Sequence, residues 1–426
     1  MARIALLTWG SHGDVLPFVA LAHALHDAGH EVFIGAQPYH ASFVRQHGLS
    51  FHALGGETSV ERYQQLMEQL IDEPNPRKQM RLLLQEMLLS DLEAQYQDAM
   101  AALQGKDNAP VDLVVAHWMQ LAGMAAAESL QIPGVTVSLN PVGIGVVAET
   151  AAARNLGKML SDYVWGEEFH HFRARHGLPP VESVADYQYS KSLNLVAVSA
   201  ALLPEREQYA PSNRITGFWS LKPAQTAANP AYPSIPENLK TFLQHPEKLV
   251  VFSFGSMGGR AGEMTNIVRE AVRLAGCRAI LQGGWAGLGA GEMEDEEILR
   301  VHYIPHDFLF SQAACIVHHG GAGTTAAALQ AGVPSVIVWH MLDQPYWGNR
   351  LAELELGPRP LARLNLQPEE LAARIREVLG HPAYTEHCRA VAKTLASQAG
   401  TKAAVREIEG FLSSGIGSLE AKTVQR

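Results

Sequence analysis

The chain has 426 residues, which is more than a single hydrophobic core usually organises, so two domains are expected. Hydrophobic residues make up 47% of the sequence and charged residues 18%, a composition typical of folded proteins and unlike that of disordered chains. The formal net charge of −10 argues against a nucleic-acid partner, because a negative surface repels a polyanion.

Cysteine usage and apolar runs indicate the compartment. The three cysteines, Cys277, Cys315 and Cys388, are far apart, so they indicate neither a disulfide framework nor a zinc site. The apolar stretch Ile4–Trp9 is too short for a signal peptide. No run approaches the ~20 apolar residues of a membrane span. We therefore expect a cytoplasmic protein with no membrane span.

The N-terminal segment has the pattern of a βαβ unit. Pro17 stands where the first turn of a helix tolerates proline, and Gly29 follows the last periodic apolar residue. The predicted order is a strand, a glycine turn, a helix and a second strand: Arg3–Thr8, Gly10–Gly13, Phe18–Ala28 and Glu31–Gly35. This order is typical of a doubly wound α/β domain.

A methionine-rich helical stretch, Glu57–Gln104, interrupts this alternation. It packs into the core or lines an adaptable apolar pocket. The sheet then resumes with the strand Asp112–Ala116, a helix and the strand Val135–Leu139. His117 and Trp118 follow the first of these strands, at the edge where open α/β sheets bind ligands. We therefore assign His117 and Trp118 to the binding of a ligand.

The second half of the chain starts the same plan again. Leu193–Ser199 is expected to be the last strand of the first half, and the Pro- and Ala-rich stretch Lys222–Pro236 an interdomain linker. A strand at Lys248–Phe254 then leads into another glycine turn, Gly255–Gly258, and a helix.

We predict two Rossmann-like domains that face each other across a cleft. We expect residues 1–220 to form the first domain, 221–245 a linker and 246–426 the second domain. The final helix is able to pack back on the first domain.

The segment Val317-His318-His319-Gly320-Gly321-Ala322-Gly323-Thr324-Thr325 combines a strand end, a glycine turn and a helix start. Glycines let a ligand approach the backbone, and the first amides of a helix have no partner within it. The helix dipole adds partial positive charge, so the segment predicts an anion site suited to a diphosphate. The alternative is a glycine-rich turn without a ligand.

The acidic residues of the sequence do not indicate a metal site. The run Glu292–Glu297 is interpreted as a solvated surface, and the chain has no Asp-x-Asp pair of the kind that holds a metal-bound nucleotide diphosphate. No metal ligand and no cofactor is predicted.

Together these motifs resemble glycosyltransferase family 1 of the GT-B fold, especially its bacterial natural-product, sterol and rhamnolipid-type members. Three segments carry the resemblance and span nearly the whole chain: Gly10–Pro17, Phe252–Ser256 and His318–Asn349. The third segment is the specific one.

The resemblance implies a set of donor-binding residues. A carboxylate and an amide suit a sugar because together they accept from and donate to neighbouring hydroxyls. The matching positions are His319, Gly321, Ala322, Gly323 and Thr324 for the diphosphate, Asp343 and Gln344 for the sugar, Tyr303, Pro305 and His306 for the nucleobase loop, and Ser256 near the phosphate.

The resemblance also implies that Asp14 is the catalytic base. A carboxylate at the mouth of the first glycine turn is suitably placed to accept a proton from an acceptor hydroxyl. The competing interpretation is that Asp14 only caps the following helix. His12 is a second candidate base and His117 a third.

Two departures from the family pattern leave specificity open. Ala327 occupies the position of a ribose-binding glutamate in plant relatives, so uridine and thymidine donors remain alternatives. Trp339 stands where many relatives have proline just ahead of the sugar loop.

The expected activity is an inverting, metal-independent transfer of a hexose from a nucleotide diphosphate sugar, with UDP-glucose as the expected donor. The expected acceptor is a hydroxyl of a lipophilic small molecule. The resemblance implies that residues 1–220 bind this acceptor, with His117 and Trp118 as acceptor-binding residues, and that residues 246–426 bind the donor. A non-catalytic, glycosyltransferase-like partner protein and a nucleotide-sugar epimerase of the same fold are the alternatives.

Overall fold

The computed structural model describes the chain except residues 58–59, 106–109, 142–157, 160–161, 205–208, 222–234, 246–247, 256–260, 284–295, 303 and 415–426. Ser256, Tyr303, most of the predicted linker and most of the acidic run therefore lie outside the described residues.

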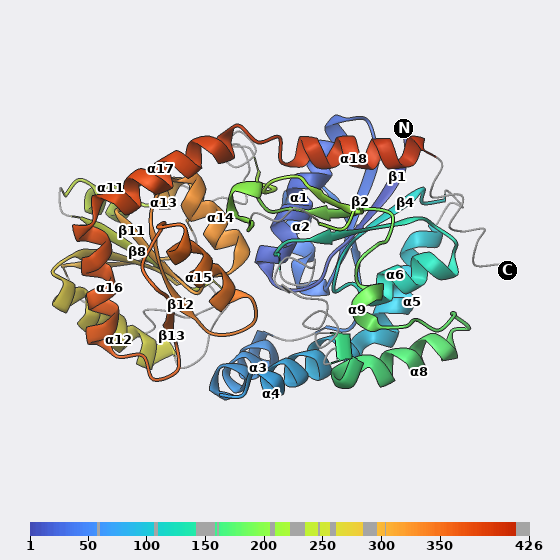
Figure 1. Ribbon diagram of the computed structural model, residues 1–426, viewed down its shortest axis with the longest axis horizontal. Helices are drawn as coiled ribbons and strands as arrows, with labels where there is room; N and C mark the ends of the chain where they lie inside the picture. Colours follow the sequence, from blue (N-terminus) through green and yellow to red (C-terminus); the bar gives the residue numbers. More distant parts are fainter. Residues whose placement is uncertain are drawn as a thin grey trace. The chain divides into compact units, whose positions relative to one another are not determined.

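Internal contacts divide the chain into two compact units, each built around a parallel sheet (Figure 1). The first unit comprises Met1–Thr58, Arg81–Lys222 and Gln398–Arg426, and the second comprises Ser59–Met80 and Pro223–Ser397. Two segments thus group with the unit that is distant in sequence: Ser59–Met80 with the second unit, and the C-terminal segment with the first.

The first unit has a seven-stranded parallel sheet with the order β3-β2-β1-β4-β5-β6-β7. The strand order reverses between β1 and β4, so their carboxyl ends flank the crevice where open sheets of this kind bind ligands. The strands are β1 (Arg3–Leu7), β2 (Glu31–Ala36), β3 (Ser50–Ala53), β4 (Leu113–His117), β5 (Gly134–Ser138), β6 (Asn194–Val196) and β7 (Asn213–Ile215).

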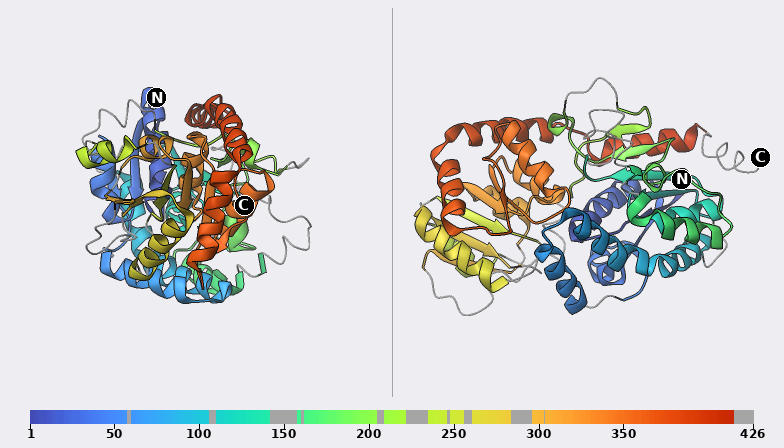
Figure 2. Two further views of the ribbon diagram at one scale, coloured as in Figure 1. Left: turned by 90° about the vertical axis from the view of Figure 1, so that its left-hand side faces the viewer. Right: turned by 60° about the horizontal axis from the view of Figure 1, so that its bottom comes forward.

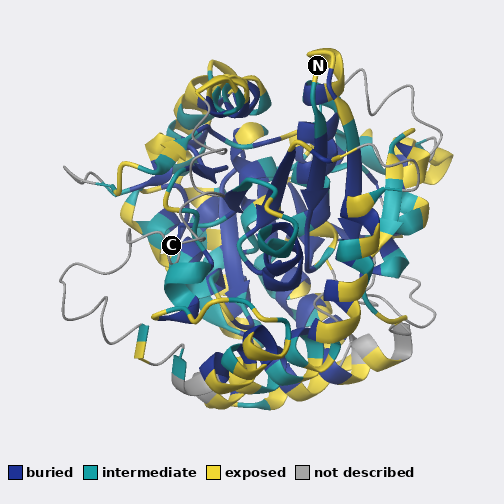
Figure 3. Cartoon of the chain, turned by 90° about the vertical axis from the view of Figure 1, so that its right-hand side faces the viewer, coloured by how far each residue is buried: buried dark blue, intermediate teal, exposed yellow. Residues whose placement is uncertain are grey.

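Helices cover both faces of this sheet, which explains why β1 is apolar throughout. Ile4 packs into a core with α1 (His12–Asp27) and α18 (Thr401–Ser413), whereas Leu7 packs on the other face with α5 (Leu92–Gln104) and α6 (Leu121–Ser129). The buried strands are dark blue in Figure 3. The remaining α-helices of this unit are α2 (Ala41–Gln46), α8 (Glu167–Arg175) and α9 (Val184–Tyr187), and α4 (Pro76–Leu83) passes from the second unit into it.

The second unit has a six-stranded parallel sheet with the order β10-β9-β8-β11-β12-β13. Its order reverses between β8 and β11, the same plan as in the first unit. The strands are β8 (Leu249–Ser253), β9 (Arg278–Gln282), β10 (Ile298–Val301), β11 (Cys315–His318), β12 (Ser335–Trp339) and β13 (Leu361–Ala362).

In the second unit, α12 (Ala261–Ala275) and α16 (Pro368–Gly380) pack side by side (Figure 2). In the same unit, α14 (Ala322–Gln330) packs against α13 (His306–Ser311) and α17 (Pro382–Ala396). The other helices of this unit are α3 (Val60–Asp72), α11 (Glu237–Leu243) and α15 (Gln344–Glu353). The predicted fold class, two Rossmann-like α/β domains, is confirmed.

Two predictions about secondary structure were wrong, and one strand was missed. Helix α1 begins at His12, six residues before the predicted start at Phe18, because Ser11 and Asp14 cap it ahead of Pro17. The first sheet does not end with the strand near Leu193, since β7 follows β6 at its edge. In the second sheet the edge strand β13 was missed, because two residues are too few to show a periodicity.

None of the helices that the structure describes is long and apolar enough to cross a membrane.

Candidate active site

The turn between β11 and α14 leaves the start of α14 uncapped. Its N-cap is Gly321, which has no side chain to accept a hydrogen bond from the first-turn amides, and no acidic residue stands in that turn. The first helical bond runs from Thr325 N to Gly321 O at 2.9 Å. The amides of Ala322, Gly323 and Thr324 precede that bond and have no acceptor within the helix. Because Gly323 is exposed, these amides are accessible to an anion.

Glycine is required at two positions of this turn. Gly320 has φ +88°, and a Cβ there would lie 2.8 Å from Ile337 Cγ2. A Cβ on Gly321 would lie 2.4 Å from His319 Nε2. The His319 ring therefore packs directly over Gly321, beside the free amides.

Both histidines of the turn are held neutral. Burial lowers the pKa of His319 to about 4, and burial also lowers the pKa of His318 well below its ordinary value. Gly320 N donates to His318 Nδ1 at 3.1 Å, which places the proton of the neutral ring on Nε2. His319 Nδ1 has no hydrogen-bond partner among the described residues. The ring nitrogen next to Gly321 is Nε2, so His319 brings this atom to the predicted diphosphate site.

The predicted sugar residues lie at the start of α15, just after β12. Gln344 is 4% exposed, and its Oε1 accepts from His340 N at 2.7 Å and from Met341 N at 3.0 Å. Asp343 Oδ2 accepts from Trp347 Nε1 at 3.0 Å. Leu342, the residue before Asp343, has φ +57°, a conformation that non-glycine residues rarely adopt and that is common in binding loops. Both side chains therefore shape the loop.

Pro305 and His306 begin α13, at the carboxyl edge beside β8. His306 lies 3.3 Å from Ser253 Oγ through Nε2, and its ring stacks on Phe310 at 4.3 Å between centroids. Burial lowers the pKa of His306 to about 4. The described part of the predicted base loop is thus fixed against the sheet by a neutral imidazole.

In the first unit, Asp14 caps α1. Its Oδ2 accepts from Ser11 N at 2.7 Å and from Ser11 Oγ at 2.9 Å, and Ser11 Oγ accepts in turn from Gly13 N at 3.2 Å. Gly10 is required beside it, since a Cβ there would lie 2.5 Å from Asp14 Oδ2. Burial raises the pKa of Asp14 to about 6, and the bonds from Ser11 limit that rise. Asp14 therefore caps α1, and because a pKa near 6 also suits a general base, its capping role does not exclude a catalytic one.

The other two candidate bases differ in accessibility. His12 is exposed, and its ring centroid lies 3.9 Å from that of Phe43. His117 is 4% exposed, its Nδ1 has no partner among the described residues, and burial lowers its pKa to about 3. Trp118 next to it stacks on Tyr189 at 6.0 Å.

The His117 ring lies 6.3 Å from that of Phe18, a residue of α1. The structure thus brings Asp14 and His117 to the same edge of the first sheet, because β1 and β4 are neighbours.

Sequence reasoning missed two groups of supporting contacts, one at the first glycine turn and one made by Gln79. Tyr39 Oη and His40 Nε2 lie 2.9 Å and 3.0 Å from Gly10 O and so hold the first glycine turn. Gln79 Nε2 donates to Leu70 O at 2.7 Å and reaches His340 O at 3.5 Å. The second contact joins the methionine-rich helices to the loop that precedes Asp343, and no sequence pattern links residues so far apart.

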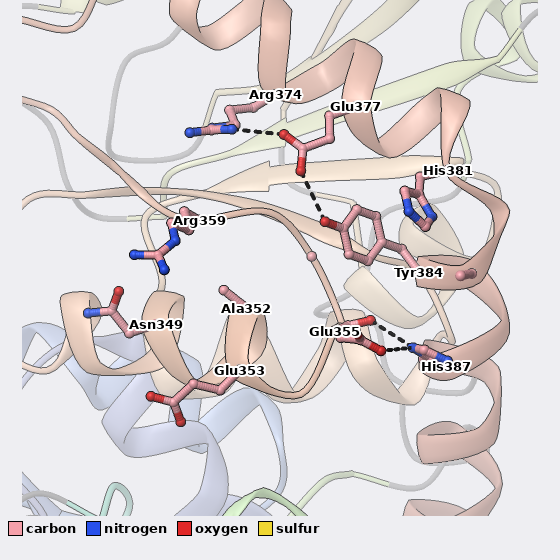
Figure 4. A pocket seen from close by; sticks show the side chains of 12 residues that line it. Asn349, Ala352, Glu353, Glu355, Arg359, Arg374, Glu377, His381, Tyr384 and His387 are labelled. Carbon is pink, nitrogen blue, oxygen red and sulfur yellow. Dashed lines mark hydrogen bonds and ion pairs between the residues drawn. The ribbon is translucent and has the colours of Figure 1, made fainter.

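A surface hollow in the second unit is a separate candidate site. The hollow, of about 680 Å³, is lined by α15, α16 and α17 (Figure 4). Its carboxylates are used internally: Glu377 binds Arg374 at 2.8 Å and Tyr384 at 3.0 Å, and Glu355 pairs with His387. No group of metal-ligating side chains occurs among the described residues of either unit.

Comparison with known proteins shows which families share these features. Residues 4–145 match the family described as the glycosyltransferase family 28 N-terminal domain. Residues 291–410 match the C-terminal domain of the erythromycin biosynthesis protein CIII-like family. The two matches cover both glycine turns described above.

Individual relatives extend over most of the chain. A sterol 3-beta-glucosyltransferase of Arabidopsis thaliana is 30% identical over 95% of this chain and 67% of its own length. The O-mycaminosyltylonolide 6-deoxyallosyltransferase of Streptomyces fradiae is 30% identical over 96% of this chain and 97% of its own. The crystal structure of the kitacinnamycin glycotransferase has the same fold, with a TM-score of 0.73 at 21% identity over 96% of this chain and 98% of that one.

Proposed function

Because the chain belongs to the family 1 glycosyltransferases of the GT-B fold, we propose that it transfers a hexose from UDP-glucose to a hydroxyl of a lipophilic small molecule. The coarser activity, nucleotide-sugar-dependent glycosyl transfer to a small molecule, follows from the family. The finer proposal adds the donor, an inverting course and independence of metal ions.

The observation that carries the proposal is the uncapped start of α14 beside His319. Free amides and a neutral imidazole provide hydrogen bonds for the charge that develops on a departing diphosphate. They need no metal ion to do so, because the amides, the helix dipole and the ring are already in place.

In the proposed reaction, Asp14 accepts the proton of the acceptor hydroxyl. That oxygen attacks the anomeric carbon of the donor from the face opposite the diphosphate, so the configuration inverts. A carboxyl group with a pKa of about 6 is ionised at neutral pH and basic enough to accept the proton as the new bond forms. The bonds from Ser11 go to Oδ2, and they orient the carboxylate for proton transfer through Oδ1.

The proposed acceptor class rests on two similarities. The relatives that are 30% identical include an enzyme named for sterols and one named for a macrolide, both lipophilic and hydroxylated. In the first unit, Leu84, Leu88 and Leu92 extend an apolar core from the methionine-rich segment. Met87 and Leu89 beside them are only partly buried, and an acceptor with an extended apolar skeleton suits such accessible apolar side chains.

The donor base and sugar are the least constrained part of the proposal, because one relative is named for glucose and the other for 6-deoxyallose. A mass-spectrometric screen of UDP- and dTDP-sugars against sterols, macrolides and hydroxylated aromatics tests them together, in buffer containing EDTA. We expect a hexosyl product from UDP-glucose with inverted anomeric configuration, established by NMR.

The two alternative functions give different results in the same screen. Donor binding without turnover on any acceptor favours a non-catalytic partner protein. Isomerised nucleotide sugar in the absence of acceptor favours an epimerase. A metal requirement, seen as activity restored only by a divalent cation, contradicts the proposed mechanism.

A further inference from the structure

Three neighbouring strands of the second sheet end in basic side chains. The first residues after β11, β12 and β13 are His319, His340 and Arg363. Trp339 pairs with Ala362, so His340 and Arg363 follow at the same level of the sheet edge. The pKa of His340 is lowered to about 3, chiefly by burial and in smaller part by the nearby His319 and Arg363. The three groups form a row along the carboxyl edge.

Arg363 is a buried cation without a hydrogen-bonded carboxylate. The residue is 7% exposed, and its Nη2 has no hydrogen-bond partner among the described residues. The nearest carboxylate oxygen, Glu263 Oε2, lies 3.7 Å away on a side chain that is 49% exposed. Burying a guanidinium is costly unless it is paired and hydrogen-bonded, and at Nη2 the long contact with Glu263 leaves the hydrogen bond missing.

Another buried arginine of this chain shows what full compensation looks like. Arg173 is 1% exposed and donates to both oxygens of Glu128, at 2.8 Å and 2.9 Å. It also donates to Pro179 O at 2.6 Å and 3.0 Å, and its guanidinium lies 4.6 Å from the Tyr187 ring centroid. An arginine buried for structural reasons is thus saturated with partners here. Arg363 is not, and it stands at the edge of the sheet where ligands bind.

His340 adds a second unsatisfied group. It is 7% exposed, its Nδ1 has no partner among the described residues, and its ring centroid lies 5.8 Å from that of Phe254 at the end of β8. Two side chains, each more than nine-tenths buried, therefore present one polar atom each, Arg363 Nη2 and His340 Nδ1, without a hydrogen-bond partner among the described residues. Such atoms are usually satisfied by water or by a ligand.

We propose that Arg363 and His340 form a second anion-binding position, which continues the diphosphate site of His319 along the sheet edge and holds an anionic oxygen of the nucleotide-sugar donor. This proposal rests on the proposed function. Two groups of a donor supply that chemistry: the β-phosphate, and the carboxylate of an acidic sugar such as a hexuronate. A guanidinium recognises either group through paired hydrogen bonds.

Calorimetric titration of the full chain with UMP, UDP, UDP-glucose and UDP-glucuronate tests the proposal. The variants are Arg363→Met, which removes the charge, and Arg363→Lys, which keeps it. The control is Arg374→Met, because Arg374 binds Glu377 in the surface hollow of Figure 4. Losing a hydrogen bond between charged groups weakens binding by roughly 10- to 100-fold. We expect such a loss of affinity in Arg363→Met, a smaller loss in Arg363→Lys, and no loss in the control Arg374→Met.

The pattern across ligands identifies the anionic group. A loss for UDP and both UDP-sugars but not for UMP assigns Arg363 to the β-phosphate. A loss confined to UDP-glucuronate assigns Arg363 to a sugar carboxylate. An equal loss for all four ligands, UMP included, overturns the proposal, because it indicates a structural role for Arg363.

Two further results separate this proposal from the proposed function. Unchanged affinities in Arg363→Met, together with weaker UDP binding in His319→Ala, overturn only the role of Arg363. Failure of the wild type to bind any of the four ligands overturns both proposals. If Arg363→Met does not fold, the same titrations are made with His340→Phe. This variant removes the neighbouring ring nitrogens and keeps an aromatic ring against Phe254, and we expect it to bind the donor more weakly. Unchanged affinity in that variant also contradicts the proposal.

Discussion

The two glycine turns of this protein share one backbone plan and differ in what occupies the helix start. In the first unit, Ser11 and Asp14 form a capping box, so α1 satisfies its own N-terminus. In the second unit, Gly321 leaves α14 without a side-chain cap. A helix start that is filled by its own residues presents a side chain to a ligand, whereas an unfilled start presents amides. The first turn is therefore suited to proton transfer and the second to holding an anion.

Replacing the carboxylate of the first turn tests its chemical role. Asp14→Asn keeps an oxygen that accepts from Ser11 and so keeps the cap, but the amide is not a base. We expect kcat to fall by ~10²–10⁴-fold, the usual contribution of a positioned base, with unchanged donor binding. Product formation is measured beside donor hydrolysis, with Asp186→Asn as control because Asp186 pairs with Lys158 at the surface. If Asp14→Asn transfers the sugar at the wild-type rate, Asp14 is not the base, and His12 or His117 is the remaining candidate.

Removing the imidazole of the second turn tests the anion site. His319→Ala should lower kcat/KM by ~10²–10³-fold, as loss of one preorganised donor does, while the melting temperature stays close to that of the wild type. The matched control is His387→Ala, since His387 is exposed and paired with Glu355. A full rate with an unchanged KM for the donor shows that His319 does not contact the diphosphate.

A smaller change to the same turn tests how precisely the ring must be placed. In Gly321→Ala the new methyl group would lie 2.4 Å from His319 Nε2, so the ring has to move. Displacing a catalytic group by about 1 Å costs up to ~10²-fold, so we expect a loss of kcat/KM no greater than that of His319→Ala. Equal activity of Gly321→Ala and the wild type contradicts the packing described for this turn.

The smallest effect is expected where the cap of the first turn is weakened. Ser11→Ala should destabilise the protein by about 1 kcal/mol, the usual worth of such a cap. The bond from Ser11 Oγ lowers the pKa of Asp14, and its loss therefore raises this pKa further above about 6, although the bond from the backbone N of residue 11 remains. A base must be ionised to act, and the acid limb of the pH profile of kcat/KM should therefore shift to higher pH. Activity above pH 8 should change little, and an unshifted acid limb argues against Asp14 as the base.

The sequence allowed the fold and both turns to be predicted, because long apolar strands and glycine-to-helix transitions leave local patterns. The same patterns did not reveal that Asp14 both caps a helix and has a raised pKa, since the second property depends on burial. Arg363 was missed because it follows a strand of only two residues. The contact of Gln79 with His340 was missed because it joins segments with no shared motif.

The most direct test of the difference between the two turns places an acidic side chain at the uncapped N-terminus of α14. Thr324→Glu places a carboxylate at the third position of α14, where Asp14 stands in α1, and Thr324→Val is the control that removes only the hydroxyl. An acidic side chain there stabilises the helix dipole but competes with a bound anion. Isothermal titration with UDP in EDTA should show roughly tenfold weaker binding or more in Thr324→Glu, about 1.4 kcal/mol, with the melting temperature unchanged or higher. Equal UDP affinity in the wild type and Thr324→Glu would contradict the claim that the uncapped turn binds the donor diphosphate.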